Sequence, residues 1–192
     1  MKLNYSSILD FLNVKFSGTQ AIKDKSLCLT VRPEKLYDIF CFIKSGWAFK
    51  YDILIDITAI HYPSSVKINS QKNNYEFSVI YNLLSTDYNQ RLTIECLLNN
   101  SLEYVPSITS LYPCAAWYER ETYDMFGILF YGNKDLRRIL TDYGFEGFPL
   151  RKDFPVSGYL EARFCEKSKR VVLENVSLSQ ANRTFEFESP WR

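Results

Sequence analysis

Four charged residues lie within a run of large apolar side chains, in the stretch AWYERETYDMF at residues 116–126. Glu119, Glu121 and Asp124 could supply a general acid and a general base, a role that needs two carboxyl groups facing one cleft in different environments. Arg120 lies four residues before Asp124, the spacing of an ion pair on a helix. No histidine or positioned nucleophile accompanies the carboxyl groups, so the favoured interpretation is a salt-bridged helix at a packing surface, with acid–base catalysis as the alternative.

Paired cations follow this stretch. Arg137–Arg138 and Arg151–Lys152 could clamp a phosphate group. Asp135 lies near the first pair and Asp153 next to the second, so the local charge nearly cancels. Ion pairing within the chain or between subunits is therefore favoured over nucleotide binding.

The apolar residues of the stretch belong to types that anchor protein interfaces. Trp117, Tyr118, Met125 and Phe126 flank the charges, and tryptophan, tyrosine, methionine and arginine are enriched at such surfaces. Charges buried at an interface must be paired, or each costs several kcal/mol. The stretch thus predicts a docking surface anchored by these apolar residues. Its register is expected to be fixed by paired charges from Glu119, Arg120, Glu121, Asp124, Arg137, Arg138, Arg151, Lys152 and Asp153.

The elements that must position these residues follow from periodicity. Residues 6–14 and 33–45 have apolar residues at helical spacing, and residues 26–31 are typical of a strand. Three more segments alternate apolar with polar residues, the pattern of an antiparallel meander: 51–60, 75–84 and 91–98. This order predicts an α+β fold, a two-layer domain with helices on one face of a mixed, mainly antiparallel sheet.

Two of the strands have further expectations attached. In the first, Ile53, Ile55, Ile57 and Ala59 are expected to share the buried face. In residues 75–84, Tyr75, Phe77 and Tyr81 share one face and could stack RNA bases. No basic cluster flanks them, so a core or subunit-facing stripe is favoured over an RNA-binding module. The single histidine, His61, is expected in a loop at a strand end.

The second half of the chain has a different character. Residues 106–132 are expected to form a helix-like segment followed by a strand, so that residues 1–132 make up the α+β body. Residues 133–192 are rich in glycine, proline and charge, with little periodicity, and predict a long extended C-terminal arm. Its aromatic residues need other surfaces to lie on, which indicates packing on neighbouring subunits.

The overall composition excludes several classes of protein. With 23 basic and 22 acidic residues the formal net charge is +1, which does not favour nucleic acid as a partner. The five cysteines include no C-x-x-C pair, so neither a metal nor an iron–sulfur site is expected on this chain. The chain has no secretory signal and no apolar run approaching the ~20 residues of a membrane span, so it is expected to work in the compartment where it is made.

A family signature can be recognised in two consecutive stretches, WYERETYDMFGILFYGNKDLRRIL and YGFEGFPLRKDFPVSGY. Together they resemble the NADH dehydrogenase subunit 9 family, the mitochondrial version of the bacterial C subunit. Members of this family form the 30 kDa subunit of respiratory complex I (NADH:ubiquinone oxidoreductase). The resemblance implies a non-redox structural subunit of the peripheral, matrix arm of an enzyme complex that couples NADH-to-ubiquinone electron transfer to proton translocation. It implies no catalytic, cofactor or metal site on this chain, with FMN and iron–sulfur clusters on partner subunits.

The same resemblance implies partners and a location. The expected neighbours are the large hydrogenase-like subunit that helps form the quinone site and its cluster-bearing neighbour. The expected location is the matrix side of the mitochondrial inner membrane, with the gene in the mitochondrial genome. The corresponding subunit of a bacterial or chloroplast relative is the alternative.

Two positions depart from the family pattern: Asn133 replaces a usual histidine or lysine, and Phe148 replaces a usual histidine. Both put a polar contact of the relatives in doubt.

Overall fold

The computed structural model describes residues 20–23, 27–45, 50–63, 75–100, 102–180 and 183. The chain forms two compact units, residues 1–154 and residues 155–192, called here the body and the C-terminal unit. The sequence pattern ends the body at residue 132, whereas the compact unit continues through Phe154. The reason is that Asp124 and Phe126 hold the following segment, residues 138–151, through hydrogen bonds to Arg138 and Arg151.

A five-stranded sheet forms the base of the body, with the strand order β1-β2-β5-β4-β3. Its strands are β1 (Gln20–Lys23), β2 (Leu27–Val31), β3 (Ile53–His61), β4 (Phe77–Ser85) and β5 (Gln90–Leu98). Strands β3, β4 and β5 make the predicted antiparallel meander, β1 is antiparallel to β2, and β2 runs parallel to β5. The predicted mixed, mainly antiparallel sheet is therefore confirmed.

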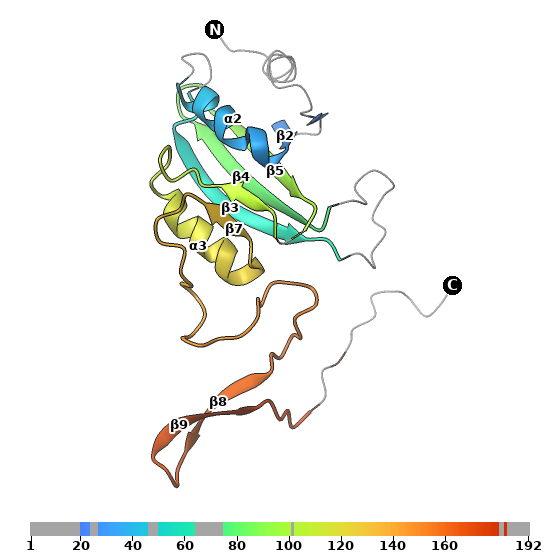
Figure 1. The fold of residues 1–192 in the computed structure, drawn as a ribbon, viewed down its shortest axis with the longest axis vertical. Coiled ribbons are helices and arrows are strands. Elements are labelled where there is room, and N and C mark those ends of the chain that lie inside the picture. The colour runs from blue at the N-terminus through green and yellow to red at the C-terminus, as the bar shows by residue number, and fades with distance from the viewer. Residues whose placement is uncertain are drawn as a thin grey trace, which may run out of the picture. The chain divides into compact units, whose positions relative to one another are not determined.

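Two helices, α2 (Pro33–Ser45) and α3 (Ala115–Phe126), lie on the same face of this sheet (Figure 1). Helix α2 buries the apolar residues that recur every three or four positions, and Pro33 occupies its first turn, where no backbone N–H is needed. The α+β two-layer prediction and the helix over 33–45 are confirmed. The helix predicted over 6–14 lies outside the described residues.

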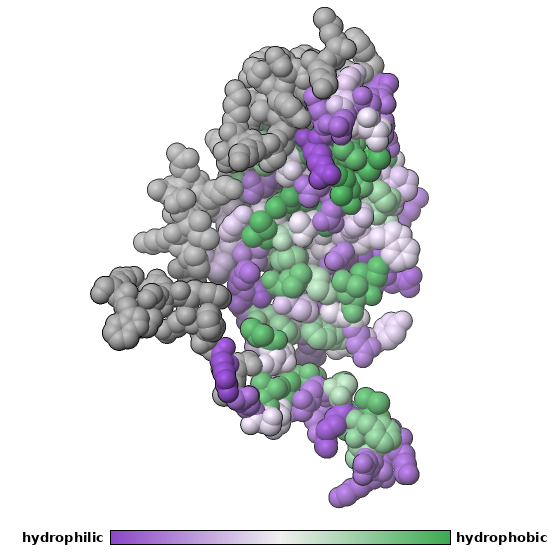
Figure 2. Space-filling model, turned by 180° about the vertical axis from the view of Figure 1, so that it is seen from behind, coloured by the Kyte–Doolittle hydropathy of each residue, from purple (hydrophilic) through white to green (hydrophobic). Residues whose placement is uncertain are grey.

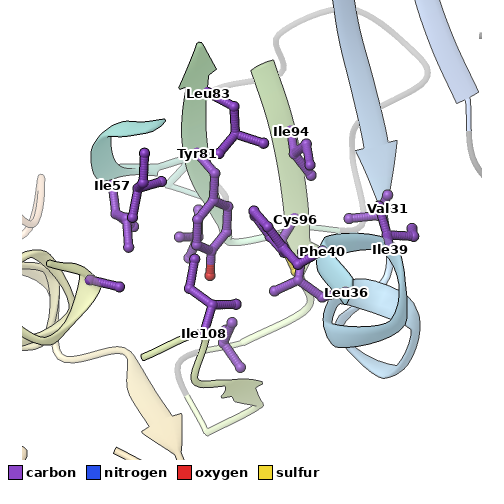
Figure 3. Close-up of a cluster of buried hydrophobic side chains, with 14 of the residues drawn as sticks. Val31, Leu36, Ile39, Phe40, Ile57, Tyr81, Leu83, Ile94, Cys96 and Ile108 are labelled. Atoms are coloured by element: carbon purple, nitrogen blue, oxygen red, sulfur yellow. The ribbon is translucent and has the colours of Figure 1, made fainter. Parts of the chain in front are cut away.

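The core lies between the helices and the sheet (Figure 3). Phe40 of α2 meets Tyr81 of β4 edge to face, with ring centroids 5.1 Å apart, a favoured aromatic geometry. Phe77 and Tyr81 are fully buried. Because neither ring is available to stack on a base, the RNA-binding alternative is wrong.

Strand β3 differs from the predicted pattern of burial. A bulge between Leu54 and Asp56 interrupts the pairing of β3 with β4. The extra residue reverses the alternation, so Leu54 and Ile57 are buried while Ile53 and Ile55 are exposed. Neither α2 nor α3 covers the opposite face of the sheet, and Figure 2 shows apolar side chains gathered among polar ones on that side.

The segment 106–132 is helical only in its centre. A short parallel pair, β6 (Tyr104–Pro106) and β7 (Leu129–Tyr131), brackets α3, and turns occupy residues 109–114. The parallel pairing requires a crossover connection, and α3 supplies it. The predicted helix and strand are both present, with the helix beginning later than the sequence pattern indicated.

The C-terminal unit contains a β-hairpin made of β8 (Leu160–Cys165) and β9 (Arg170–Asn175). The sequence predicted a long extended arm without paired strands, so the hairpin is a difference from that expectation. Among the described residues, no helix has the length and apolar character needed to cross a membrane.

Candidate functional site

The charged stretch of the sequence forms α3, whose end is set by a glycine. Gly127 adopts φ +77°, a left-handed conformation that glycine enters without steric cost, and its N–H donates to the Tyr123 carbonyl at 2.8 Å. A Cβ at this position would lie 2.5 Å from Nη2 of Arg151 and 2.7 Å from the Phe148 ring. Glycine is therefore required both by the backbone and by the residues that pack over it.

Asp124 is the most heavily bonded carboxylate near the end of α3. It is fully buried and accepts hydrogen bonds from Arg138 Nη1 at 2.9 Å and from the Thr141 hydroxyl at 2.6 Å. Its Oδ2 also accepts from the backbone N–H groups of Ile139, Leu140 and Thr141 at 3.1, 2.7 and 2.9 Å. Burial would raise the pKa of Asp124, but these hydrogen bonds outweigh it and hold the pKa at about 2.

Glu119 lies one turn earlier on α3 and is also fully buried. Its Oε1 accepts from the Ile108 N–H at 2.9 Å, and its Oε2 accepts from the Ser107 hydroxyl and from Asn133 Nδ2, both at 2.8 Å. Burial raises the pKa of Glu119, and these three hydrogen bonds offset part of that rise. Asn133, the departure from the family pattern, thus keeps a polar contact in this chain.

Arg120 is bonded differently from the expected ion pair. It donates from Nε to the Arg137 carbonyl at 3.0 Å and from Nη2 to the Arg138 carbonyl at 3.3 Å. The available pair between Arg120 and Asp124 is replaced by the pair between Arg138 and Asp124. Arg120 therefore ties the segment after β7 to α3 through backbone carbonyls, while Arg137 pairs with Asp135 at the surface.

Arg151 packs against the C-terminal end of α3. Its Nε donates to the Phe126 carbonyl at 2.5 Å, and its guanidinium lies over the rings of Phe148 and Phe77, at 4.4 and 5.2 Å from their centroids. Burial lowers the pKa of Arg151, and Asp153 opposes that effect. Phe148, the second departure from the family pattern, is therefore one of the rings that hold Arg151.

His61 was expected in a loop and instead ends β3, with 7% of its surface exposed. Its ring stacks on Phe77 at a centroid distance of 4.6 Å, and its Nδ1 accepts the Lys152 N–H at 2.9 Å. Asp153 Oδ1 lies 3.9 Å from the same nitrogen. The His61 ring thus fixes the backbone of the Arg151–Asp153 turn against the sheet.

The predicted apolar anchors occupy different environments. Trp117 is 63% exposed, Tyr118 and Met125 are half-buried against the core, and Phe126 is buried within the core. The structure brings Glu119, Arg120, Asp124 and their partners into one cluster. Trp117 meets this cluster through Arg120, whose guanidinium lies 5.4 Å from the centroid of the Trp117 ring, whereas Glu121 is exposed. The interface role of these residues stays a prediction.

The sequence did not reveal which residues outside α3 contact its side chains. These are Ser107, Asn133, Thr141 and Phe148. The contact of His61 with the Lys152 N–H was also missed. Thr141 and Asn133 are short polar residues in a loop, which is a common pattern, so their types alone gave no signal. Within the described ranges, no three His, Cys, Asp or Glu side chains gather as they would to hold a metal ion.

Comparison with known proteins places this geometry in a family. The family model that describes the 30 kDa subunit of respiratory-chain NADH dehydrogenase matches residues 29–160 of this chain. The chain belongs to this family. The matched range includes most of the sheet, both described helices and the whole α3 cluster, and it confirms the resemblance seen in the sequence.

Curated relatives of the 30 kDa subunit family agree. The C subunit of NADH-quinone oxidoreductase from Ruegeria pomeroyi is 49% identical, over 86% of this chain and 78% of that protein. NADH-ubiquinone oxidoreductase subunit 9 of Prototheca wickerhamii is 47% identical, over 84% of this chain and 79% of that protein. NADH dehydrogenase (ubiquinone) iron-sulfur protein 3 of Arabidopsis thaliana is also 47% identical, over 81% of this chain and 77% of that protein.

Two solved structures share the fold. A trypsin-resistant fragment of Nqo5, residues 1–134, has a TM-score of 0.57 and 24% identity, covering 68% of this chain and 98% of the fragment. A chain of the membrane-bound sulfane sulfur reductase, an archaeal respiratory membrane complex, has a TM-score of 0.63 and 22% identity, covering 78% of this chain and 85% of that one.

In this member of the 30 kDa subunit family, the motif E-R-E-x-x-D-M-F-G is mainly a set of contacts within the chain. Glu119 holds the loop before α3 and Asn133, while Arg120 and Asp124 hold residues 137–141. The charges among large apolar side chains therefore fasten the two loops that flank α3.

Proposed function

We propose that this chain is a non-redox structural and assembly subunit in the peripheral arm of respiratory complex I. It would lie on the matrix side of the mitochondrial inner membrane and support NADH-to-ubiquinone electron transfer coupled to proton translocation. FMN and the iron–sulfur clusters would be held by other subunits. The family match supports the complex, and relatives from Prototheca and Arabidopsis support the mitochondrion. The equally similar bacterial relatives keep a bacterial complex as the alternative.

The observation that carries the structural role is the bonding of the buried carboxylates. Glu119 accepts three hydrogen bonds and Asp124 accepts five, all from this chain, so neither presents a free oxygen to a substrate. Glu121 is exposed. A general acid and a general base must reach the same reacting group. The stand-alone acid–base enzyme therefore lacks a carboxyl pair that could perform its chemistry.

The C-terminal hairpin supports docking on other subunits. Its register places Ala162 opposite Leu173 and Phe164 opposite Val171, so these residues share one face, and the last three are more than half exposed. A two-stranded hairpin is at best marginally stable alone in water, and an apolar face gains stability when a partner covers it. The proposed partners are the large hydrogenase-like quinone-site subunit and its cluster-bearing neighbour.

The opposite face of the hairpin offers a matched control. There Arg163 and Glu174 form an exposed salt bridge of 2.8 Å, a kind of contact that contributes little stability. The double variant Phe164→Ser/Leu173→Ser should reduce the amount of intact complex on native gels, whereas Arg163→Ser/Glu174→Ser should leave it near the wild-type amount.

The outcome separates the two functions. Loss of the complex in the apolar variant, with an unchanged unfolding transition of the purified chain, supports an assembly role. Full assembly in both variants would contradict docking through this hairpin. Full assembly with a selective loss of NADH:ubiquinone turnover would instead indicate chemistry on this chain.

A further inference from the structure

A groove on the body lies between the start of α2 and the β6–β7 pair, and its lining shares no residue with the α3 cluster. It encloses about 600 Å³ and is lined by three tyrosines, two glutamates and two prolines. The tyrosines are Tyr37, Tyr104 and Tyr131, and the glutamates are Glu34 and Glu103. Nothing in the α3 cluster or the hairpin uses these residues.

Strand geometry explains why the aromatic rings gather there. Tyr104 and Pro106 are two residues apart on β6, and β7 pairs Tyr131 with Pro106, so these three side chains share one face. Val105 and Phe130 point the other way and are buried in the core. Tyr104 and Tyr131 are 62% and 77% exposed. The β6–β7 pair therefore carries exposed aromatic rings on a firmly packed base.

The third tyrosine is held in place from the helix side. Tyr37 lies one turn into α2, and its hydroxyl is 3.1 Å from Oγ of Ser110. Glu103 is also fixed, because its carboxylate accepts from the backbone N–H and the side-chain amide of Asn99. These contacts orient the walls of the groove before any ligand arrives, which lowers the ordering cost of binding.

The chemistry of the lining favours a cation. Aromatic faces attract guanidinium and ammonium groups, and the two charged residues that line the groove are both glutamates. A guanidinium matches best because it is planar, stacks on aromatic rings and donates to carboxylates through a fixed fork. An anion is disfavoured by the same glutamates, although the groove adjoins the start of a helix.

We propose that this tyrosine groove binds an arginine side chain from an extended segment of a neighbouring protein. The guanidinium stacks on Tyr104 and Tyr131 and is neutralised by Glu34 and Glu103, while the prolines pack against the flanking backbone. The proposal concerns the chain itself and does not depend on which complex the chain belongs to.

The first experiment uses the purified full chain and a capped Gly-Arg-Gly peptide. Binding is followed through the NMR ring-proton signals of labelled tyrosines. The matched probe is Gly-citrulline-Gly, which has nearly the same shape without the charge. We expect saturable shifts of the Tyr104 and Tyr131 signals with the arginine peptide, and binding about tenfold weaker with citrulline.

Variants then test the individual contacts. Tyr131→Ile and Glu34→Gln should each weaken binding of the arginine peptide, and both residues lie at the surface, where the fold tolerates change. The controls are Tyr143→Ile and Glu146→Gln, two exposed positions outside the groove, which should bind as the wild type does. Equal binding of the two peptides, no binding of either, or equal effects of groove and control variants would overturn the proposal.

A second experiment identifies the source of the cation in the assembled complex. A photo-crosslinking phenylalanine analogue replaces Tyr131, and the crosslinked fragment is sequenced by mass spectrometry. We expect a protein segment with an arginine within a few residues of the crosslink. A segment without arginine, or no crosslinked protein, would overturn the proposal. Because the peptide titration uses the chain alone, its result is independent of the assembly experiments above.

Discussion

Replacement of Asp124 by alanine is the sharpest test of how the body is held together. Asp124 is fully buried and accepts five hydrogen bonds from Arg138, Ile139, Leu140 and Thr141. Alanine would leave the Arg138 guanidinium and three backbone N–H groups without their acceptor. We expect the segment 138–154 to detach from α3 and the free energy of unfolding to fall.

The size of the loss follows from the kinds of contact removed. A hydrogen bond to a charged group contributes about 1.5–3 kcal/mol, and breaking a buried ion pair costs about 3–5 kcal/mol. Leu140 is exposed and Ile139 and Thr141 are half-buried, so water can replace part of what their N–H groups lose. A net loss of about 3–4 kcal/mol is therefore expected for Asp124→Ala.

The acid limb of the stability curve supplies an independent measure. The pKa of Asp124 is lowered from 3.8 to about 2, so its carboxylate contributes stability that is fully present above about pH 4. That contribution is lost as the pH falls through about 2, and it corresponds to about 2 kcal/mol. The difference in unfolding free energy between wild type and Asp124→Ala should therefore narrow by about this amount on acidification.

The assay is urea unfolding of the purified chain, followed by circular dichroism, together with limited trypsin digestion. Asp142→Ala is the control, because Asp142 is an exposed aspartate in the same segment. Its carboxylate accepts the adjacent Tyr143 N–H, and the Phe145 N–H that its backbone carbonyl accepts is kept in the alanine variant. The control should stay within about 0.5 kcal/mol of wild type. The reasoning fails if Asp124→Ala is no less stable than Asp142→Ala and the segment around Arg138 resists trypsin equally in both.

Two further substitutions test the interior and the C-terminal cap of the same helix. Burial raises the pKa of Glu119, so the wild type should lose stability relative to Glu119→Gln as the pH rises from 4.5 through the pKa of the folded state. A difference in unfolding free energy between the two proteins that stays constant between about pH 4 and 8 would contradict this. Gly127→Ala should cost about 2 kcal/mol more than Gly144→Ala, since both glycines have φ +77° but only Gly127 has Phe148 and Arg151 where the Cβ would lie. Similar thermal shifts for both alanine variants would show that packing over Gly127 is unimportant.

The layered fold could be predicted because burial imposes a period on the sequence. Apolar residues every three or four positions predicted α2, and alternation predicted β3, β4 and β5. The faces of β3 could not be predicted from strict alternation, because the extra residue at the bulge shifts the inner and outer positions by one. Ile57 and Ala59, after the bulge, face the core as predicted, whereas Ile53 and Ile55 face outward. A pattern with a period of two does not reveal where one extra residue is inserted in a strand.

The candidate site could be predicted as a set of charges but not as a set of partners. Helical spacing offered Arg120 to Asp124, yet Asp124 is satisfied mainly by backbone N–H groups, which every residue but proline carries. No residue type marks a loop whose successive N–H groups converge on one carboxylate. Arg138, fourteen positions away, supplies the cation, and only the folded loop brings it there.

This bonding changes what a charge variant of the motif would mean for assembly. Asp124 and Arg138 act within the body, so their loss would impair assembly through a loosened fold. Trp117, Glu121 and Lys152 are exposed, so they are the residues through which the predicted recognition of a neighbouring subunit is expected. An interface effect therefore leaves the unfolding of the isolated chain unchanged, whereas a folding effect moves assembly and unfolding together. The motif residues therefore fall into two classes: those whose bonding partners lie within this chain, and those that are exposed.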